Sequence, residues 1–441
     1  MRVCIVGTLL VLLAPSGAAW AQQPYNVSVQ VNELSRIFTE LYGSSGLVVN
    51  SSTPLASGAT HSGHFNSGFE SEFSQFGTAL TSQIVSLPLP PPASGFTYQF
   101  DPGLGVFTRS TNNFGPILSE RAETIGAGRV SIGFAYQRLT FDTIEGINLG
   151  AIPAVFTHDS AELRGGREDV VTTLNSIQAT VSRSAAFLSF GVTDRLDVSV
   201  AIPVIAADVA VRSDATIRRI GTTNPETHFF RALDDSVDTR RTFSAFGRAS
   251  GLGDITVRLK QAVAKSGTRG TAVGVDLRLP TGDERNLLGT GAPGVQPFVA
   301  WSAVYGAISP HVNAGYQWNG DSIIGGNPGT GVAEDLPDAG VYTVGAVVAV
   351  HPRITAAVDV VGRYVIDSPR IRRETFRALD GTSVFPNITF TSGSFNELSS
   401  AVGLKVNVAG RLLLDVNLLV SLNSVGLRDK ISPLIGLEYA F

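Results

Sequence analysis

Few residues of this 441-residue chain have a type and spacing that could support chemistry. The run Gly289-Thr-Gly-Ala-Pro-Gly294 has the G-x-G-x-x-G spacing of a phosphate-binding turn, but Pro293 favours a glycine-rich loop over the start of a helix. His311 and Asn313 could serve in a barrel phospholipase, yet the sequence places no serine beside them. The six histidines lack paired metal-binding spacing. We therefore predict no catalytic residues, no cofactor and no metal site.

The N-terminus has the pattern of a secretory signal peptide. An apolar run from Val3 to Ala14 precedes the small-x-small sequence Ala19-Trp20-Ala21, so residues 1–21 are predicted to be removed. The single cysteine, Cys4, would leave with them, which excludes disulfides from the mature chain. The net charge of −4 gives no reason to expect a nucleic-acid partner.

The larger part of the chain alternates between apolar and polar residues. Charged residues make up 16% of the sequence, well below the roughly 25% usual for soluble domains. From about residue 127 onward, twelve segments have period-2 alternation, and the clearest is the last, with Ile431, Pro433, Ile435, Leu437, Tyr439 and Phe441 on one face. The pattern predicts an all-β fold, a 12-stranded antiparallel transmembrane β-barrel over residues 126–441. Residues 22–125 are predicted to form a partly helical plug.

The lengths of the connections distinguish a membrane barrel from a soluble sandwich. Alternate gaps between the segments are short, and the others are mostly long, at about 141–170, 213–250, 281–294, 319–339 and 366–397, with one short exception near 423–429. Short periplasmic turns and long outer loops are typical of barrels in the bacterial outer membrane. Aromatic residues on the outward parity form two groups, one near each end of the strands, as expected for interfacial girdles. These residues are Tyr136, Tyr316, Trp318, Tyr342 and Tyr364 towards the outside, and Phe190, Tyr305, Tyr439 and Phe441 towards the periplasm.

Charged and polar residues on the opposite parity would face the lumen. Hairpin counting places Arg258 near Asp276 and Lys405 near Asp415, where opposite charges can pair across strands. The group can be a structural network that lines or closes the barrel, or an ion-selective path. Its members are Arg129, Asp197, Arg258, Asp276, Arg278, His311, Asp359, Arg363, Lys405 and Asp415.

The plug segment is rich in phenylalanine. Helical spacing is seen in Leu34, Ile37, Phe38, Leu41 and Tyr42, and again in Phe65, Phe69, Phe73, Phe76 and Leu80. If this segment enters the lumen, its rings would supply apolar surface for a hydrophobic substrate. The alternative is that they only pack the plug. The candidate substrate path consists of Phe65, Phe69, Phe73, Phe76, Phe96, Phe100 and Phe107. Replacing Phe69, Phe73 and Phe76 by alanine would then slow uptake.

Several strand-and-turn phrases resemble a known family. The phrases FGVTDRLDVSVAIP (190–203), GLGDITVRLK (251–260), LRLPTGD (277–283) and HVNAGY (311–316) resemble those of the outer-membrane transporters of the phenol-degradation meta-pathway family. The resemblance implies a barrel similar to the fatty-acid and toluene channels, and passive uptake of small hydrophobic molecules, aromatic ones among them.

The end of the chain carries a second resemblance. Gly436, Tyr439 and Phe441 resemble the signal that the outer-membrane barrel-assembly machinery reads. The expected partners are therefore this machinery, outer-membrane lipid and lipopolysaccharide, and a small hydrophobic solute. Two alternative functions remain open at this point: an autotransporter-like translocator barrel, and a structural or adhesive outer-membrane barrel.

Overall fold

The computed structural model describes residues 26–43, 46–52, 63–71, 73, 75–86, 98–101, 106–109, 113–157, 169–221, 225–232 and 235–441. Strands dominate these ranges. The described helices are all too short or too polar to cross a bilayer.

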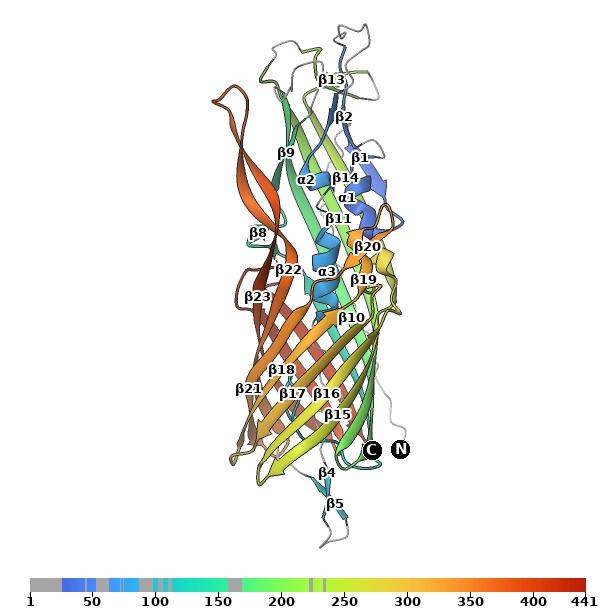
Figure 1. Cartoon of the computed structure of the whole chain (residues 1–441), viewed down its shortest axis with the longest axis vertical. Coiled ribbons are helices and arrows are strands. Elements are labelled where there is room, and N and C mark those ends of the chain that lie inside the picture. Colours follow the sequence, from blue (N-terminus) through green and yellow to red (C-terminus); the bar gives the residue numbers. More distant parts are fainter. Residues whose placement is uncertain are drawn as a thin grey trace, which may run out of the picture.

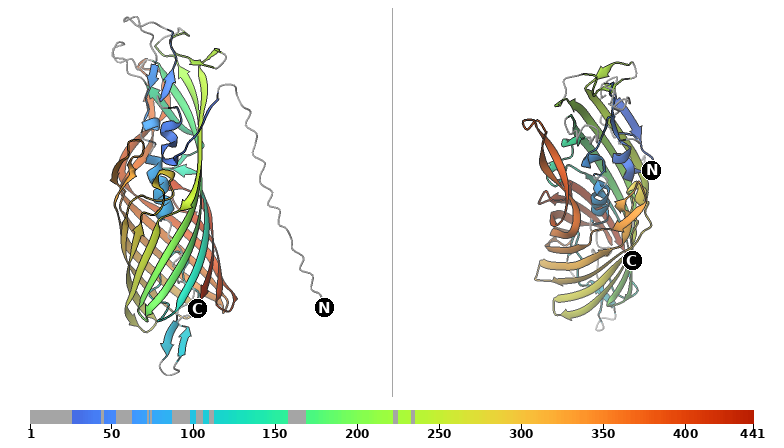
Figure 2. Two further views of the ribbon diagram at one scale, coloured as in Figure 1. Left: turned by 90° about the vertical axis from the view of Figure 1, so that its right-hand side faces the viewer. Right: turned by 45° about the horizontal axis from the view of Figure 1, so that its top comes forward.

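Twelve antiparallel strands close into a barrel (Figures 1 and 2), which confirms the predicted fold. Each strand pairs with the next along the chain, and the ring closes because β26 pairs with β6, and β6 with β10. The ring consists of β6 (Val130–Thr140), β10 (Val170–Thr193), β11 (Leu196–Arg218), β15 (Ile255–Ser266), β16 (Arg269–Leu279), β17 (Gly294–Ala303), β18 (Ile308–Asn319), β21 (Ala339–His351), β22 (Ile354–Arg377), β23 (Val384–Ala409), β24 (Leu412–Ser421) and β26 (Ile431–Ala440). Five tight turns join strands at one end, where the sequence predicted them.

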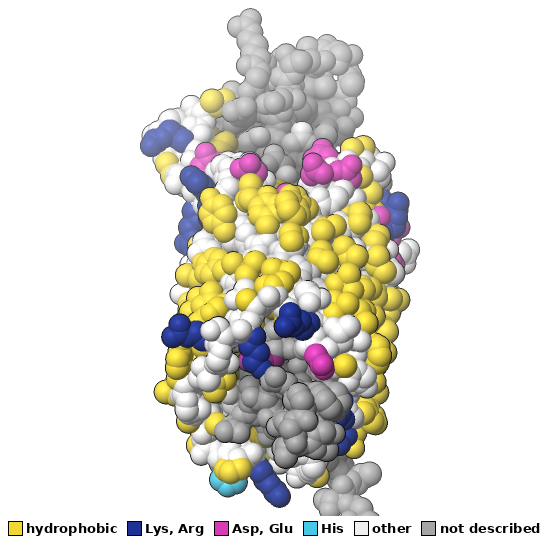
Figure 3. Space-filling view, turned by 60° about the horizontal axis from the view of Figure 1, so that its bottom comes forward, with side chains coloured by type: hydrophobic (Ala, Val, Ile, Leu, Met, Phe, Trp, Pro, Cys, Tyr) yellow, Lys and Arg dark blue, Asp and Glu magenta, His cyan; other side chains and the backbone are white. Residues whose placement is uncertain are grey.

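The lower outer wall of the barrel exposes many apolar side chains, and Figure 3 shows them on one face. Because this belt turns away from a polar lumen, it is the lipid-facing surface of a membrane barrel. Exposed members include Ile132, Phe134, Leu188, Phe190, Ile202, Val204, Leu259, Val273, Leu277, Val299, Val312, Val344, Val358, Val360, Val402, Leu404, Val416, Leu418, Ile435 and Leu437. The predicted girdle residues Tyr136, Trp318, Tyr364, Tyr305 and Tyr439 are also exposed on this surface.

Above the belt, the polarity of the two faces is inverted. Strand β10 is 24 residues long, and its outward residues change from Leu188 and Phe190 to Gln178 and Ser176. Its inward residues change in the opposite sense and include Ile177, which is buried. The outer face of this upper part therefore meets water, and its inner face borders an apolar core.

Two of the predicted long loops are largely strand, which corrects the sequence prediction. In the range 213–250, β11 continues to Arg218 and is followed by β14 (Arg240–Leu252). In the range 366–397, β22 and β23 continue as one long hairpin. The upper sheet also includes β9 (Ile152–Thr157), paired with β10, and β1 (Asn26–Gln30), which pairs in parallel with β14.

The N-terminal segment packs against this upper sheet, as Figures 1 and 2 show. It contains η1 (Leu34–Arg36), α1 (Ile37–Glu40), α2 (Gly68–Ser71), α3 (Gln75–Ser86) and the strand pair β2 (Leu47–Val49) and β3 (Gly63–Phe65). The other small elements are β4 (Tyr98–Asp101), β5 (Val106–Arg109), β7 (Thr143–Ile144), β8 (Ile147–Asn148), β12 (Phe230–Arg231), β13 (Val237–Asp238), η3 (Glu284–Asn286), β19 (Asp321–Asn327), β20 (Val332–Asp335) and β25 (Leu427–Arg428).

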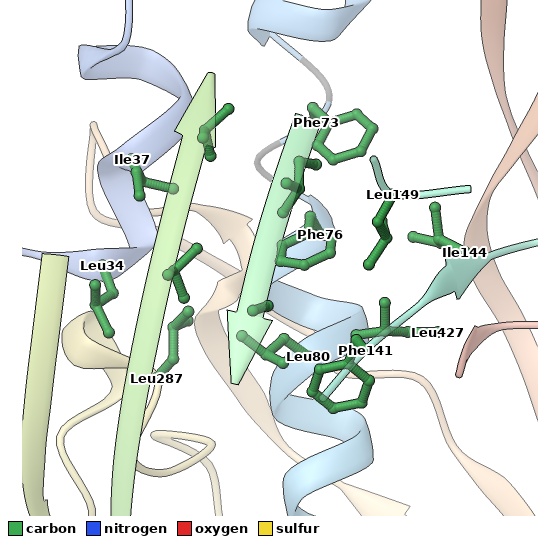
Figure 4. Close-up of a cluster of buried hydrophobic side chains, with 14 of the residues drawn as sticks. Leu34, Ile37, Phe73, Phe76, Leu80, Phe141, Ile144, Leu149, Leu287 and Leu427 are labelled. Carbon is green, nitrogen blue, oxygen red and sulfur yellow. The ribbon is translucent and has the colours of Figure 1, made fainter. Parts of the chain in front are cut away.

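Phenylalanine rings form the centre of this upper core. The ring of Phe38 contacts those of Phe69, Phe73 and Phe76, with centroids 4.8–6.0 Å apart. Figure 4 shows Phe73 and Phe76 facing other buried apolar side chains such as Leu149. The predicted single helical stripe is wrong, because its first ring lies in strand β3 and the others are divided between α2, α3 and the turn between them.

A buried carboxylate ties two outer loops together and predicts acid sensitivity. Asp169 Oδ2 lies 2.7 Å from His228 Nδ1, and Asp169 Oδ1 accepts hydrogen bonds from the N–H groups of Ile220 and Gly221. Burial would raise the pKa of Asp169, but these hydrogen bonds outweigh it and hold the pKa below 3.8. A group with a lowered folded-state pKa stabilises the fold above its unfolded pKa, and that contribution is lost as the pH falls through the folded-state value.

We therefore expect the outer loops to become progressively protease-sensitive as the pH falls below about 4, the ordinary pKa of an aspartate, towards the lowered folded-state pKa of Asp169. The Asp169→Asn variant should be cleaved at neutral pH as well and should show no such pH step. Asp208→Asn is the control, because Asp208 pairs with Arg248 on the exposed face. Identical pH profiles of wild type and Asp169→Asn would contradict the expectation.

Candidate functional site

Residues 113–125, here called the lumen segment, lie inside the lower half of the barrel. Most of their side chains are buried, including Phe114, Ile117 and Ile125. This segment lacks regular secondary structure, so its backbone N–H groups need partners from the barrel wall. The wall supplies them as inward-facing polar side chains from at least four strands.

Asp359 on β22 is the main acceptor for the lumen segment. Its Oδ2 accepts hydrogen bonds from the N–H groups of Ile117 and Leu118, at 2.9 and 2.8 Å. Its Oδ1 lies 2.5 Å from His311 Nε2 on β18. Asp359 is fully buried, and His311 is 2% exposed. The His311–Asp359 pair therefore orients a carboxylate that holds the segment in place.

Glu120 is the second point of attachment. Its carboxylate forms an ion pair with Arg258 and lies 3.0 Å from Lys260 Nζ on the same strand, β15. Arg258 also forms a bidentate pair of 2.6 Å hydrogen bonds with the carboxylate of Asp276 on β16. Lys260 Nζ lies 3.8 Å from Asp197, whose carboxylate accepts from the backbone of the lumen segment. Charges from the wall and from the segment thus neutralise one another.

Amide and hydroxyl groups complete the attachment. Asn313 on β18 accepts from Ser119 Oγ and from the Glu120 N–H, at 2.7 and 2.6 Å, and its amide donates to the Glu120 carbonyl at 2.8 Å. Ser302 on β17 accepts from the Ala122 N–H at 3.0 Å. The segment is held from β11 to β22, more than half of the ring.

A cavity of about 160 Å³ remains between the lumen segment and the wall formed by β15 to β22. Its lining includes Leu118, Arg258, Arg278, Phe298, Gln317 and Arg363. Above it lies α3, where Thr81 and Ser82 border a smaller cavity together with Arg278 and Arg363. Gln83 of α3 donates a 2.5 Å hydrogen bond to Glu397. The cavity is therefore bounded below by the lumen segment and above by α3.

The predicted lumen residues face inward and are distributed over several ion pairs. The hairpin predictions are confirmed: Arg258 pairs with Asp276, and Lys405 is opposite Asp415 with 3.9 Å between the charged atoms. Arg129 is the exception in position, because it precedes β6 and is partly exposed. Sequence reasoning did not single out Glu120, Asp254 or Glu397. A signal was present for Glu120 alone, in the closely spaced charges of Glu120, Arg121 and Glu123.

The predicted phenylalanine path has a different environment from the cavity. Phe65, Phe69, Phe73 and Phe76 are at most 2% exposed and pack in the upper core. Phe96 lies outside the described residues. Phe100 and Phe107 are register partners in the β4–β5 hairpin, and their side chains are likewise not described. The four described rings therefore do not line the 160 Å³ cavity, although Phe76 borders a smaller one of about 30 Å³ together with Arg363.

The three residues of the expected assembly signal lie on β26 or directly after it. Gly436 pairs with Asp415 of β24, while Tyr439 and Phe441 are exposed on the lipid-facing surface with ring centroids 4.8 Å apart. In the described part of the chain, His, Cys, Asp and Glu side chains do not gather into a group of three that could hold a metal ion.

Comparison with known proteins gives one family and several barrels. Residues 167–332 match the family model described as "Putative MetA-pathway of phenol degradation". The COG4313 outer membrane channel from Pseudomonas putida F1 is 12% identical, with a TM-score of 0.44, over 73% of this chain and 98% of that one. The NanC porin is 8% identical (TM-score 0.34; 70% and 98% covered). A FadL homologue of Pseudomonas aeruginosa is 9% identical (TM-score 0.30; 71% and 88% covered). The curated proteins include no match.

The closed ring, the lipid-facing belt and the polar, partly filled lumen define the class: a transmembrane β-barrel of the outer-membrane type. Within that class, the chain is similar to the MetA-pathway family. All four phrases that carried the resemblance in the sequence fall inside the matched range, so the resemblance is confirmed over residues 167–332.

Proposed function

We propose that this chain is a passive transporter that admits small hydrophobic solutes, aromatic ones among them, through the bacterial outer membrane. The proposal includes export by a signal peptide over residues 1–21 and insertion by the barrel-assembly machinery. The observation that carries it is the 160 Å³ cavity, which lies inside the lumen between the lumen segment and α3.

The proposed path passes through this cavity and not through the phenylalanine cluster. A solute needs free volume and at least one wall that it can contact, and the cavity has both, with Phe298 and Leu118 on its lining. The rings of the upper core have the other role that the sequence left open, which is to pack α3 and its neighbours. Passage then requires the lumen segment or α3 to move aside.

Filling the cavity provides the test. Thr343 on β21 is 7% exposed and lines the cavity, whereas its neighbour Val344 is 52% exposed on the lipid side. We expect Thr343→Trp to reduce the rate at which benzyl alcohol enters proteoliposomes, measured above the rate for protein-free liposomes, at least fivefold, while Val344→Trp leaves it unchanged. Both variants should keep the heat-modifiable gel migration of a folded barrel.

The alternatives predict different results in the same assay. With a structural or adhesive barrel, even the wild type would show no uptake above that of protein-free liposomes. An autotransporter-like translocator would release residues 22–125 outside the cell. If the phenylalanines carried the substrate, the Phe69→Ala, Phe73→Ala and Phe76→Ala triple variant would slow uptake and Thr343→Trp would not.

A further inference from the structure

Two arginines face the same enclosed space in the lumen. Arg278 on β16 and Arg363 on β22 line both the 160 Å³ cavity and the smaller one below α3. They are only 6% and 9% exposed. Like charges on the wall of one cavity repel each other, and an anion between them would remove this repulsion.

The hydrogen bonding of Arg278 is incomplete. Its Nη2 donates to Asn319 Oδ1 at 2.8 Å, but within the described ranges Nε has no hydrogen-bond partner. The nearest paired carboxylate, Asp254, is 3.8 Å from that Nε. Asp254 already accepts from the N–H groups of Gly282 and Thr290 and from the Thr290 hydroxyl. Its lone pairs are therefore largely occupied by other donors.

The hydrogen bonding of Arg363 is also incomplete. Its Nη1 is 3.8 Å from Glu397 Oε2, and its Nε has no hydrogen-bond partner among the residues that the structure describes. The other oxygen of Glu397 accepts from Gln83. Arg258, on the strand next to that of Arg278, instead makes two 2.6 Å hydrogen bonds to Asp276. A guanidinium has five N–H donors, and donors left unsatisfied when buried are costly. Neither arginine is fully hydrogen-bonded, and both side chains line the cavity.

Part of the cavity lining can contact a flat apolar ring, beside polar groups such as Glu120, Asp276 and Gln317. Phe298 lies on the wall of the cavity. Its register partners on the two neighbouring strands are Gly274 and Gly315, which leave room for the phenyl ring of Phe298. A Cβ at Gly274 would lie 2.3 Å from Phe298 Cζ. Leu118 and Val361 add aliphatic surface. A cavity of about 150 Å³ accommodates one benzene molecule, so the 160 Å³ here matches a single six-membered ring.

We propose that the lumen cavity is a binding site for a small aromatic carboxylate, with its carboxylate on Arg278 and Arg363 and its ring against Phe298. Guanidinium groups bind carboxylates through paired, charge-assisted hydrogen bonds, which fix orientation as well as charge. This inference rests on the proposed function and names the chemical class of one substrate.

Benzoate and benzyl alcohol, which differ in the charged group but share the ring, are the probes. Equilibrium dialysis of the full chain in detergent should show at least tenfold tighter binding of benzoate. Arg278→Gln and Arg363→Gln should each raise the benzoate Kd at least tenfold and change the benzyl alcohol Kd less than twofold. Arg248→Gln is the matched control, because the Arg248 side chain is 81% exposed above the belt.

Equal wild-type affinities for the two probes, or unchanged benzoate binding in both glutamine variants, would overturn the carboxylate site. If the glutamine variants do not fold, two other measurements decide whether the carboxylate site exists. One is the preference of the wild type for benzoate over benzyl alcohol. The other is benzoate binding by Arg363→Lys, which keeps the charge but loses the paired donors. Failure of the proposed function can be distinguished from failure of the carboxylate site. In the first case the protein would not carry either probe into proteoliposomes, whatever the affinity of the probe.

Discussion

Asp359→Ala is expected to increase solute flux through the barrel at least tenfold. Asp359 accepts two backbone hydrogen bonds from Ile117 and Leu118 and pairs with His311, all in a buried setting. Hydrogen bonds to charged groups contribute roughly 1.5–3 kcal/mol each. A loss of about 3 kcal/mol would shift the balance between bound and released lumen segment by roughly a hundredfold.

Single-channel conductance and vesicle swelling with small solutes measure this effect. Asp359→Asn retains one acceptor of the same size and should give an intermediate increase. Val360→Ala, on the lipid face of the same strand, should leave the flux unchanged. A folded Asp359→Ala barrel with wild-type conductance would mean that the lumen segment is not the barrier to flow.

Leu188→Arg is expected to destabilise the barrel by about 2–4 kcal/mol, whereas Gln178→Arg on the same face of the same strand should change the free energy of unfolding by less than about 0.5 kcal/mol. Both residues lie on the outward face of β10, and Leu188 is 49% exposed. Leu188 lies in the apolar belt, and Gln178 lies above the point where the polarity inverts. An arginine must therefore enter hydrocarbon at one position and water at the other.

Urea titration of the barrel in phospholipid vesicles gives both free energies of unfolding. Equal effects at the two positions would show that the upper boundary of the membrane does not lie between them. Leu174 is 53% exposed near the top of β10 and also lies outside the belt. Leu174→Arg should therefore change the free energy of unfolding as little as Gln178→Arg does.

Local sequence patterns predict the barrel itself with good accuracy. Alternation along ten residues determines which face of a strand meets lipid, and tight turns determine the register of the hairpins they join. For this reason Arg258 could be placed beside Asp276, and Lys405 beside Asp415, by counting residues from a turn. The same reasoning turned His311 and Asn313 inward.

The upper part of the strands was missed because its pattern has the same period. Val181, Ile177 and Ser176 continue the alternation of β10 without interruption, but the apolar face has changed sides. Period alone cannot report this inversion. It depends on which face the N-terminal segment covers, and that contact joins residues more than a hundred positions apart, such as Tyr42 and Ser213.

The sequence by itself determined a twelve-stranded lipid-facing ring, its hairpin registers and its inward charges, because these follow from contacts between chain neighbours. The tertiary structure alone decided what those charges hold. The lumen segment has no period to read, and Glu120 meets Arg258 across 138 positions of sequence. Only the closed ring brings Arg278 and Arg363 to one cavity, since they lie on strands that are not adjacent in the barrel.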